Sequence, residues 1–271
     1  MLNAVFVPVW KDKPVGAITR ADVLAVIDHI QAQGKPSAAR HAFSGIRKFF
    51  NWCVERGLIE QSPCLTLKSP GRQSARERVL SDDELAEVWR GTEEIGWPFG
   101  SIVKLLALTA QRRGEVVRMQ WAEIDAKAKL WTIPGSRTKN HRTHAVPLTD
   151  TALAIIASLP RFAGSPFVFP ARGKPDQAYS GYSKGKRELN AVCTVEDWTL
   201  HDLRRTAATG MARAGVPPHV VEKILNHTTG TFGGVAGVYN RFNYQSEMRS
   251  ALEAWEQHIL ALENVELAET L

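Results

Sequence analysis

The sequence predicts a mainly α-helical protein with a small antiparallel β-sheet, divided into two domains. Three observations lead to this class. Amphipathic segments that begin with a capping box recur along the chain, two short runs of β-forming residues flank a polar, basic turn, and one stretch without apolar periodicity follows the first helical region. A chain of 271 residues can form two such domains, each with its own core.

Residues 1–67 are expected to form a small helical domain. Thr19 and Asp22 have the spacing of a capping box, and an apolar stripe follows them until Gly34. A second amphipathic helix is expected over residues 37–56. The basic side chains outside its apolar stripe are Arg40, Arg47 and Lys48.

Residues 68–79 are predicted to be a linker. Pro, Gly and Ser alternate there with basic residues, among them Arg72 and Arg76, and apolar periodicity is lost. A basic linker suits a chain that wraps around a duplex, because phosphates would hold it in place. A merely solvated connector fits this segment equally well.

Residues 80–271 are expected to form a second, mostly helical domain. Ser81 and Glu84 repeat the capping-box spacing at its start. The two β-forming runs are residues 130–134 and 144–148. Further helices are expected near residues 98–110, 149–159, 181–192, 201–214 and 217–226, followed by an amphipathic tail helix over 246–262.

The charge is unevenly distributed along the chain. The net charge is +6, and residues 1–79 account for it with twelve Lys and Arg against six Asp and Glu. Residues 127–187 hold eleven basic residues against two acidic ones, whereas residues 245–271 hold one against six. Two basic stretches favour a polyanionic partner, with solubilising surface charge as the alternative.

Cysteine usage and hydropathy bear on the compartment. The three cysteines are odd in number and lack CxxC spacing, which favours a reducing compartment over a disulfide framework or a zinc cluster. The first residues do not resemble a signal peptide, and no apolar run approaches the roughly 20 residues of a membrane span. We therefore expect a cytoplasmic, nucleoid-associated protein of a bacterium.

Two segments place basic side chains where local structure would hold them. Arg112 follows a predicted helix and precedes Glu115; an arginine at such a junction can grip a phosphate through two N–H groups, and Glu115 could orient it. Lys139 lies in the turn between the strands, where a lysine can protonate a leaving alkoxide, and Arg137 and Arg142 share this turn. A structural Arg–Glu pair and a solvated basic turn are the alternatives.

Two later segments add histidines, a second arginine and a tyrosine. His201 and Arg204 are three residues apart at a helix start, so both project from one face. His227 ends a helix, and a glycine-rich segment leads from it to Tyr239. A tyrosine has a pKa of about 10 and needs nearby cations to be a nucleophile at neutral pH. Taken singly, packing roles account for these residues as well.

Together, these segments resemble the tyrosine recombinase (phage integrase) family. That family has an Arg in a T-G-x-R-x-x-E-like segment, a hairpin Lys, an H-x-x-R motif, a further His or Trp, and then a Tyr. The matching residues, in the same order, are Arg112 with Glu115, Lys139, His201 with Arg204, His227 and Tyr239.

The resemblance extends over nearly the whole chain, with some departures. Residues 18–30 and 49–63 resemble the helical core-DNA-binding domain of integrases, which implies a tyrosine recombinase catalytic domain after it. Ala110 and Asn226 stand where the family commonly has glycine. Many integrases begin with a further arm-site-binding domain, to which nothing in this sequence corresponds.

The resemblance implies a site-specific recombinase that integrates or excises a mobile element such as a phage genome. Tyr239 would attack the scissile phosphate and form a 3′-phosphotyrosyl link with a free 5′-hydroxyl. Arg112 and Arg204 would neutralise the non-bridging oxygens. Lys139 would protonate the departing 5′-oxygen, and His201 would assist proton transfer to and from the tyrosine.

The same resemblance assigns His227 a hydrogen bond to the phosphate and implies no metal or other cofactor. The implied partners are double-stranded DNA, a homotetramer of the chain on paired recombination sites, and accessory DNA-bending or directionality proteins. DNA contacts are expected from Arg40, Arg47, Lys48, Arg72, Arg76, Arg137 and Arg142.

Several alternatives stay open. Tyr244 is a rival nucleophile five residues after Tyr239. A type IB topoisomerase-like enzyme would nick and reseal DNA without exchanging partners, and a catalytically idle remnant would only bind it. The acidic tail helix could dock on a neighbouring subunit or pack on its own domain.

Overall fold

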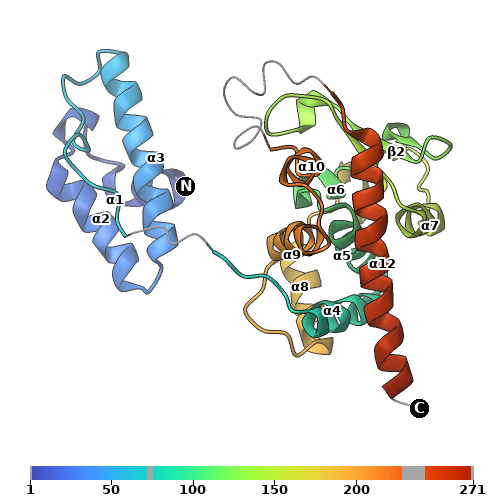
Figure 1. The fold of residues 1–271 in the computed structure, drawn as a ribbon. Coiled ribbons are helices and arrows are strands. Elements are labelled where there is room, and N and C mark those ends of the chain that lie inside the picture. The colour runs from blue at the N-terminus through green and yellow to red at the C-terminus, as the bar shows by residue number, and fades with distance from the viewer. Residues whose placement is uncertain (1, 72–75, 228–241, 270–271) are drawn as a thin grey trace. The chain divides into compact units, whose positions relative to one another are not determined.

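The computed structural model describes residues 2–71, 76–227 and 242–269, and the chain folds as two compact units, Met1–Arg76 and Glu77–Leu271 (Figure 1). The division falls inside the segment 68–79. Both units are mainly helical, and small antiparallel sheets occur in the second. The predicted fold class is confirmed. Arg72 and Tyr239 lie outside the described residues.

The first unit is built from two long helices and shorter helical turns. Its elements are η1 (Leu2–Phe6), α1 (Val7–Trp10), η2 (Val15–Ala17), α2 (Arg20–Ala32) and α3 (Pro36–Glu55). The capping box at α2 is formed, with the Asp22 backbone N–H donating to Thr19 Oγ1 at 3.3 Å. The helical turns at residues 2–10 carry no capping signal and were not expected from the sequence. Phe6 and Trp10 pack there against the buried face of α3.

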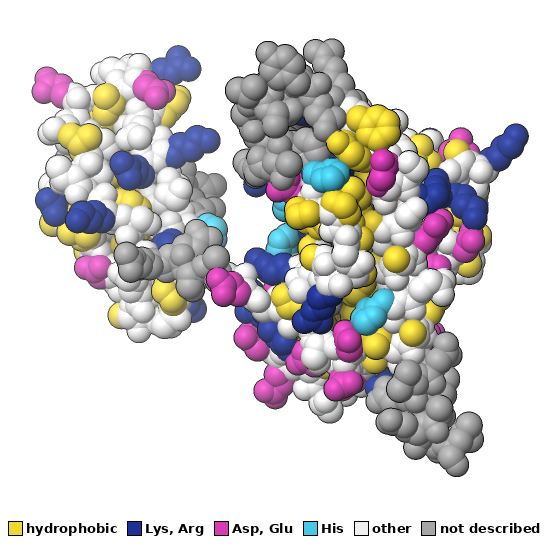
Figure 2. All heavy atoms as spheres, in the orientation of Figure 1, with side chains coloured by type: hydrophobic (Ala, Val, Ile, Leu, Met, Phe, Trp, Pro, Cys, Tyr) yellow, Lys and Arg dark blue, Asp and Glu magenta, His cyan; other side chains and the backbone are white. Residues whose placement is uncertain are grey.

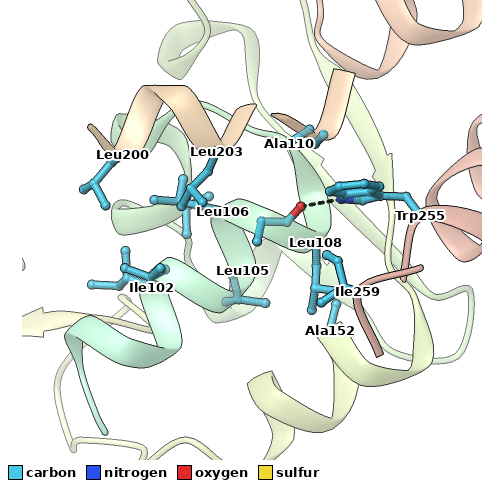
Figure 3. Packing of buried hydrophobic residues seen from close by; sticks show 14 of the residues in the cluster. Ile102, Leu105, Leu106, Leu108, Ala110, Ala152, Leu200, Leu203, Trp255 and Ile259 are labelled. Atoms are coloured by element: carbon cyan, nitrogen blue, oxygen red, sulfur yellow. Dashed lines mark hydrogen bonds between the residues drawn. The ribbon is translucent and has the colours of Figure 1, made fainter. Parts of the chain in front are cut away.

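The second unit surrounds the apolar helix α5 (Phe99–Thr109) with other helices. These are α4 (Asp82–Ile95), α6 (Arg113–Val117), α7 (Asp150–Ser158), α8 (Tyr182–Val192), α9 (Leu200–Arg213), α10 (Pro218–Ile224) and α12 (Gln245–Glu269). Side chains from α5, α7, α9 and α12 meet in one core (Figure 3). Such burial supplies most of the drive to fold.

A three-stranded antiparallel sheet lies beside the helices of the second unit. It consists of β1 (Ile124–Asp125), β2 (Leu130–Ile133) and β3 (His144–Pro147), after the 3-10 turn η3 (Trp121–Glu123). Trp131 pairs with Val146 and Ile133 with His144, which places buried side chains on one face. The connection between β2 and β3 spans 134–143, one residue more than the predicted strands leave between them, and contains the 3-10 turn η4 (Gly135–Arg137).

A second, two-stranded sheet, β4 (Pro170–Ala171) with β5 (Lys174–Ala178), was not predicted. The residues of β5 are mostly polar and exposed, so this strand lacks the alternation by which a half-buried strand is recognised.

The tail helix α12 packs on its own unit rather than leaving it. Trp255 is buried and its indole N–H donates to the carbonyl of Ala107 at 2.9 Å. Arg249 donates to the carbonyls of Ala128 and Lys129 at 3.0 and 3.2 Å. Among the described residues, no helix has the length and apolar character of a membrane span.

Candidate active site

The first component of the site is the junction between α5 and α6. α5 ends at Thr109, its C-cap residue Ala110 has a left-handed backbone with φ 54°, and Arg112 is the N-cap residue of α6. Glu115 is buried; it accepts the Arg112 backbone N–H at 2.9 Å and an Nη1–H of the same residue at 3.1 Å. One carboxylate therefore holds both the main chain and the guanidinium of Arg112, which stays partly exposed beside the helix N-terminus.

Arg204 joins this junction to the end of α10. Its guanidinium is almost completely buried and donates to the carbonyl of Ala110 at 2.5 Å and to the carbonyl of Leu225. A guanidinium has five N–H groups, so these two bonds fix its orientation without using up its donors. Burial, and after it the charge of Arg112, lower the pKa of Arg204 to about 9, so it remains charged at neutral pH.

Two histidines share the electrostatic environment of these arginines. Partial burial and the positive charges of Arg205, Arg204 and Arg112 lower the pKa of His201. Burial and the charges of Arg204 and Arg112 also lower the pKa of His227, which follows α10. The lowered pKa favours the neutral form of both imidazoles. The structure thus brings together Arg112, His201, Arg204 and His227, four of the residues that the sequence singled out.

Two buried side chains that the sequence did not single out hold the end of α10 in place. The side-chain amide of Gln111 donates to the carbonyls of Thr109 and Ile224, each at 2.8 Å. His144 Nε2 lies 3.1 Å from the same Ile224 oxygen, and burial lowers the pKa of this histidine to about 4. Gln111 stands beside the arginine in the motif, but nothing in its own residue type indicated a partner at position 224.

The basic side chains of the β2–β3 loop differ in their surroundings. Lys139 and Arg142 are exposed. Arg137 instead forms an ion pair with Glu123 at 2.5 Å and donates to the carbonyl of Arg118, and burial lowers its pKa. These bonds occupy Arg137 within its own unit, which the charge pattern of the turn could not reveal.

The other expected cationic contacts lie in the first unit and at its end. Arg47 and Lys48 are exposed on α3, and Arg40 donates to Ser37 Oγ at 3.1 Å. Figure 2 shows Lys and Arg side chains spread over the visible face of this unit. Arg76 is partly buried.

A basic groove of about 560 Å³, which we call the α8–α9 groove, adjoins His201. Arg113, Lys186 and Arg187 line it together with Tyr182 and Trp198, among other residues. Arg113 lies over the Tyr182 ring at 4.3 Å, and Lys186 Nζ lies 3.5 Å from the centre of the Trp198 ring. Burial lowers the pKa of Lys186 to about 8. The basic run at residues 184–187 was the available signal, but the sequence alone assigned no role to these residues.

The tyrosines divide into described and undescribed positions. Tyr239 lies outside the described residues. Tyr244 packs edge-on against His219, with ring centres 5.0 Å apart, and Tyr179 donates its hydroxyl to the carbonyl of Gly181 at 2.9 Å. The described residues contain no group of three or more His, Cys, Asp or Glu side chains suited to a metal ion.

The comparisons with known proteins agree with this arrangement. Residues 78–245 match the model of the phage integrase family, and residues 1–70 match that of the phage integrase central domain. The chain belongs to the phage integrase family.

Among curated members, prophage integrase IntA of Escherichia coli (strain K12) is 27% identical over 262 residues, which are 95% of this chain and 63% of that protein. Prophage integrase IntZ of the same strain is 27% identical over 259 residues, covering 93% and 62%. This chain therefore spans less than two thirds of the length of these two relatives. Tyrosine recombinase XerC of Mycobacterium bovis (strain BCG / Pasteur 1173P2) is 25% identical over 202 residues, covering 69% and 67%.

Solved integrases share the fold. A lambda integrase dimer bound to a COC′ core site superposes with a TM-score of 0.62 at 18% identity, covering 82% of this chain and 84% of that one. A lambda integrase tetramer bound to a Holliday junction gives a TM-score of 0.61 at 17% identity, covering 81% and 67%.

The two departures from the family's glycines have a common backbone setting. Ala110 has φ 54° and Asn226 has φ 48°, the left-handed region in which glycine is unstrained. Asparagine tolerates this region better than most residues, whereas alanine there costs roughly 1 kcal/mol relative to glycine. Both positions therefore have a backbone conformation that glycine adopts without strain.

Proposed function

We propose that this integrase cleaves and rejoins DNA strands through a covalent tyrosyl intermediate, as a metal-independent site-specific recombinase. The observation that carries the proposal is the convergence of Arg112, His201, Arg204 and His227 from three separate segments onto one cationic site. Two fixed guanidiniums suit a phosphate whose non-bridging oxygens gain charge in the transition state.

The proposed chemistry divides between proton transfer and covalent attack. Tyr239 attacks the scissile phosphorus, and the bond to the 5′-oxygen breaks, which leaves a 3′-phosphotyrosyl link and a free 5′-hydroxyl. His201, whose lowered pKa favours the neutral imidazole, accepts the tyrosine proton, and Lys139 donates one to the departing oxygen. His227 donates a hydrogen bond to the phosphate. Because the phosphodiester energy is kept in the tyrosyl link, a 5′-hydroxyl can reseal the strand without ATP.

The proposed substrate is double-stranded DNA bearing paired recombination sites, on which four copies of the chain assemble. The net charge of +6, the exposed Arg47 and Lys48 and the α8–α9 groove favour binding through phosphates. The solved relatives include an integrase dimer on a core site and a tetramer on a Holliday junction, which supports the same assembly here. The integration or excision of a mobile element would be the result.

Replacing Tyr239 with phenylalanine is expected to abolish covalent attachment to DNA, because the ring stays but the nucleophilic oxygen is removed. A nicked duplex library with a randomised core would be incubated with the full chain. SDS-resistant adducts would then be isolated, and their DNA sequenced to define the recombination site. Wild type should give adducts and Tyr239→Phe none, whereas Tyr244→Phe, the matched control, should retain them. Adducts with Tyr239→Phe would show that another residue attacks.

Replacing Arg187 with alanine is expected to weaken DNA binding roughly three- to tenfold at low salt, because its cation would no longer neutralise a phosphate. The slope of log K against log salt concentration should become shallower by about 1. Arg213→Ala is the matched control, since this exposed arginine lies at the opposite end of α9 from His201. Equal slopes for the Arg187 variant and wild type would exclude the α8–α9 groove from the DNA path.

Recombination and simple nicking–resealing predict different products. With two plasmids that each carry the recovered site, a recombinase yields joined molecules. A type IB topoisomerase-like enzyme yields relaxed plasmids only, and an idle binder yields neither.

A further inference from the structure

We infer that Asn140 is a positioning residue for this reaction: its side chain fixes the loop that carries Lys139 to the residue directly before His227. The inference rests on the proposed function, because it concerns the same phosphate site.

The contact joins residues that are far apart in the sequence. Asn140 Nδ2 donates to Asn226 Oδ1 at 2.7 Å and lies 3.4 Å from the Asn226 carbonyl oxygen. At its other end, Asn140 Oδ1 accepts the backbone N–H of Arg142 at 3.2 Å. The amide is thus bonded both to its own loop and to the end of α10, an arrangement that requires a donor and an acceptor on one short side chain.

The β2–β3 loop is closed on itself next to this contact. Thr138 Oγ1 lies 3.1 Å from the carbonyl oxygen of Gly135 and 2.8 Å from that of Arg142. A Cβ on Gly135 would come within 2.7 Å of the His141 carbonyl oxygen, so the two ends of the loop approach each other closely. These contacts close the loop on itself, and Asn140 bonds it to Asn226, two residues after α10.

The acceptor side is anchored to the catalytic arginine. Leu225 accepts a hydrogen bond from buried Arg204, Asn226 accepts from Asn140, and His227 follows. The consecutive residues 225–227 therefore connect Arg204 and the loop that carries Lys139 with His227. The left-handed backbone of Asn226, φ 48°, turns the chain at this point.

This connection meets a requirement of general-acid catalysis. Lys139 is exposed, and its long side chain must bring the ammonium nitrogen within about 3 Å of the departing oxygen. Fixing the backbone next to Lys139 relative to Arg204 limits the region that its ammonium group can reach. Removal of the Asn140 side-chain amide should therefore impair protonation of the leaving group while phosphate binding by the arginines is kept.

A substrate with a better leaving group separates this role from a structural one. Two nicked duplexes carrying the recovered site would differ only in the bridging 5′ atom, oxygen in one and sulfur in the other. A thiol has a pKa near 8.5, far below that of an alcohol, so the sulfur substrate needs no proton donor. Single-turnover formation of the covalent adduct would be measured with the two-unit chain described above.

We expect Asn140→Ala to slow adduct formation on the oxygen substrate about 10- to 100-fold, the range of a partly impaired general acid. On the sulfur substrate, the rate of adduct formation should fall less than about threefold. Lys139→Ala should show the same pattern with a larger defect on oxygen. Asn226→Gly keeps the left-handed backbone and removes only the side-chain acceptor, so it should give the same pattern more weakly. Ser136→Ala, at an exposed position in the same loop, should match wild type on both substrates.

Equal slowing of both substrates by Asn140→Ala would overturn the inference, since the residue would then support the fold or the binding of phosphate. The inference would also be overturned if Asn140→Ala formed the adduct on the oxygen substrate at the wild-type rate. It would equally be overturned if Lys139→Ala were slow on the sulfur substrate as well as on the oxygen substrate. If wild type binds the duplexes and forms no adduct with either, the proposed function itself fails, a result distinct from the other three.

Discussion

Replacing Arg204 with alanine is expected to lower the rate of adduct formation about a hundred- to a thousandfold, the reduction typical of removing one preorganised donor from a developing oxyanion. The guanidinium is buried and held by the carbonyls of Ala110 and Leu225, so it needs no reorganisation to meet the phosphate. After burial, its charge also contributes to the lowered pKa of His201, together with Arg205, and of His227. Single-turnover cleavage of the nicked substrate measures this rate.

Two controls identify the source of the rate reduction. Arg204→Lys keeps the charge but cannot reproduce the two-pronged geometry, and it should remain at least about tenfold slower than wild type. Arg213→Ala, an exposed arginine on the same helix, should be unaffected. The alanine variant also leaves two carbonyls without their donor, at about 1–3 kcal/mol each in stability, so cleavage is compared at a temperature where both proteins are folded. A rate for Arg204→Ala within about tenfold of wild type would contradict the assignment.

The second large effect is on stability. Trp255→Ala is expected to lower the free energy of unfolding of the second unit by about 3–5 kcal/mol. The indole is 3% exposed and donates to the Ala107 carbonyl of the central helix, as Figure 3 shows. It also packs directly on the backbone of α9, since a Cβ on Gly210 would lie 2.1 Å from the ring.

Unfolding of the full chain in urea would be monitored through hydrogen exchange of the α5 amides. Because α5 lies in the second unit, this measurement reports the stability of that unit. Glu253→Ala, an exposed position on the same helix, should change stability by less than about 0.5 kcal/mol. A destabilisation that appears only at high protein concentration would indicate that α12 docks on a neighbouring copy instead.

The helices were largely predictable because their signals are local. The capping boxes at Thr19 and Ser81 are formed as expected, and α2, α4, α8 and α9 begin within a residue or two of the expected positions. The hairpin strands also agree, because β-branched and aromatic residues mark them. The β4–β5 pair was not predicted because the residues of β5 are mostly exposed and have no apolar alternation.

Residue type and spacing predicted which side chains belong to the site, but not which contacts those side chains make. The i, i+3 spacing of His201 and Arg204 and the Arg112–Glu115 pair follow from helix geometry. In contrast, Arg137 and Arg142 look alike in the sequence, yet one is paired with Glu123 and the other is exposed. This difference depends on what packs over the loop, which no nearby residue specifies.

The amino-acid sequence by itself determined the helical class, the small sheet, the caps and the set of residues that mark the phage integrase family, because each depends on neighbours within a few positions. Only the tertiary structure decided that Arg204 bonds the ends of α5 and α10, that Asn140 bonds Asn226, and that the tail helix packs on its own unit. These interactions join positions that packing alone brings together, and the hydrogen-bonding needs of buried or strained backbone then select the partners.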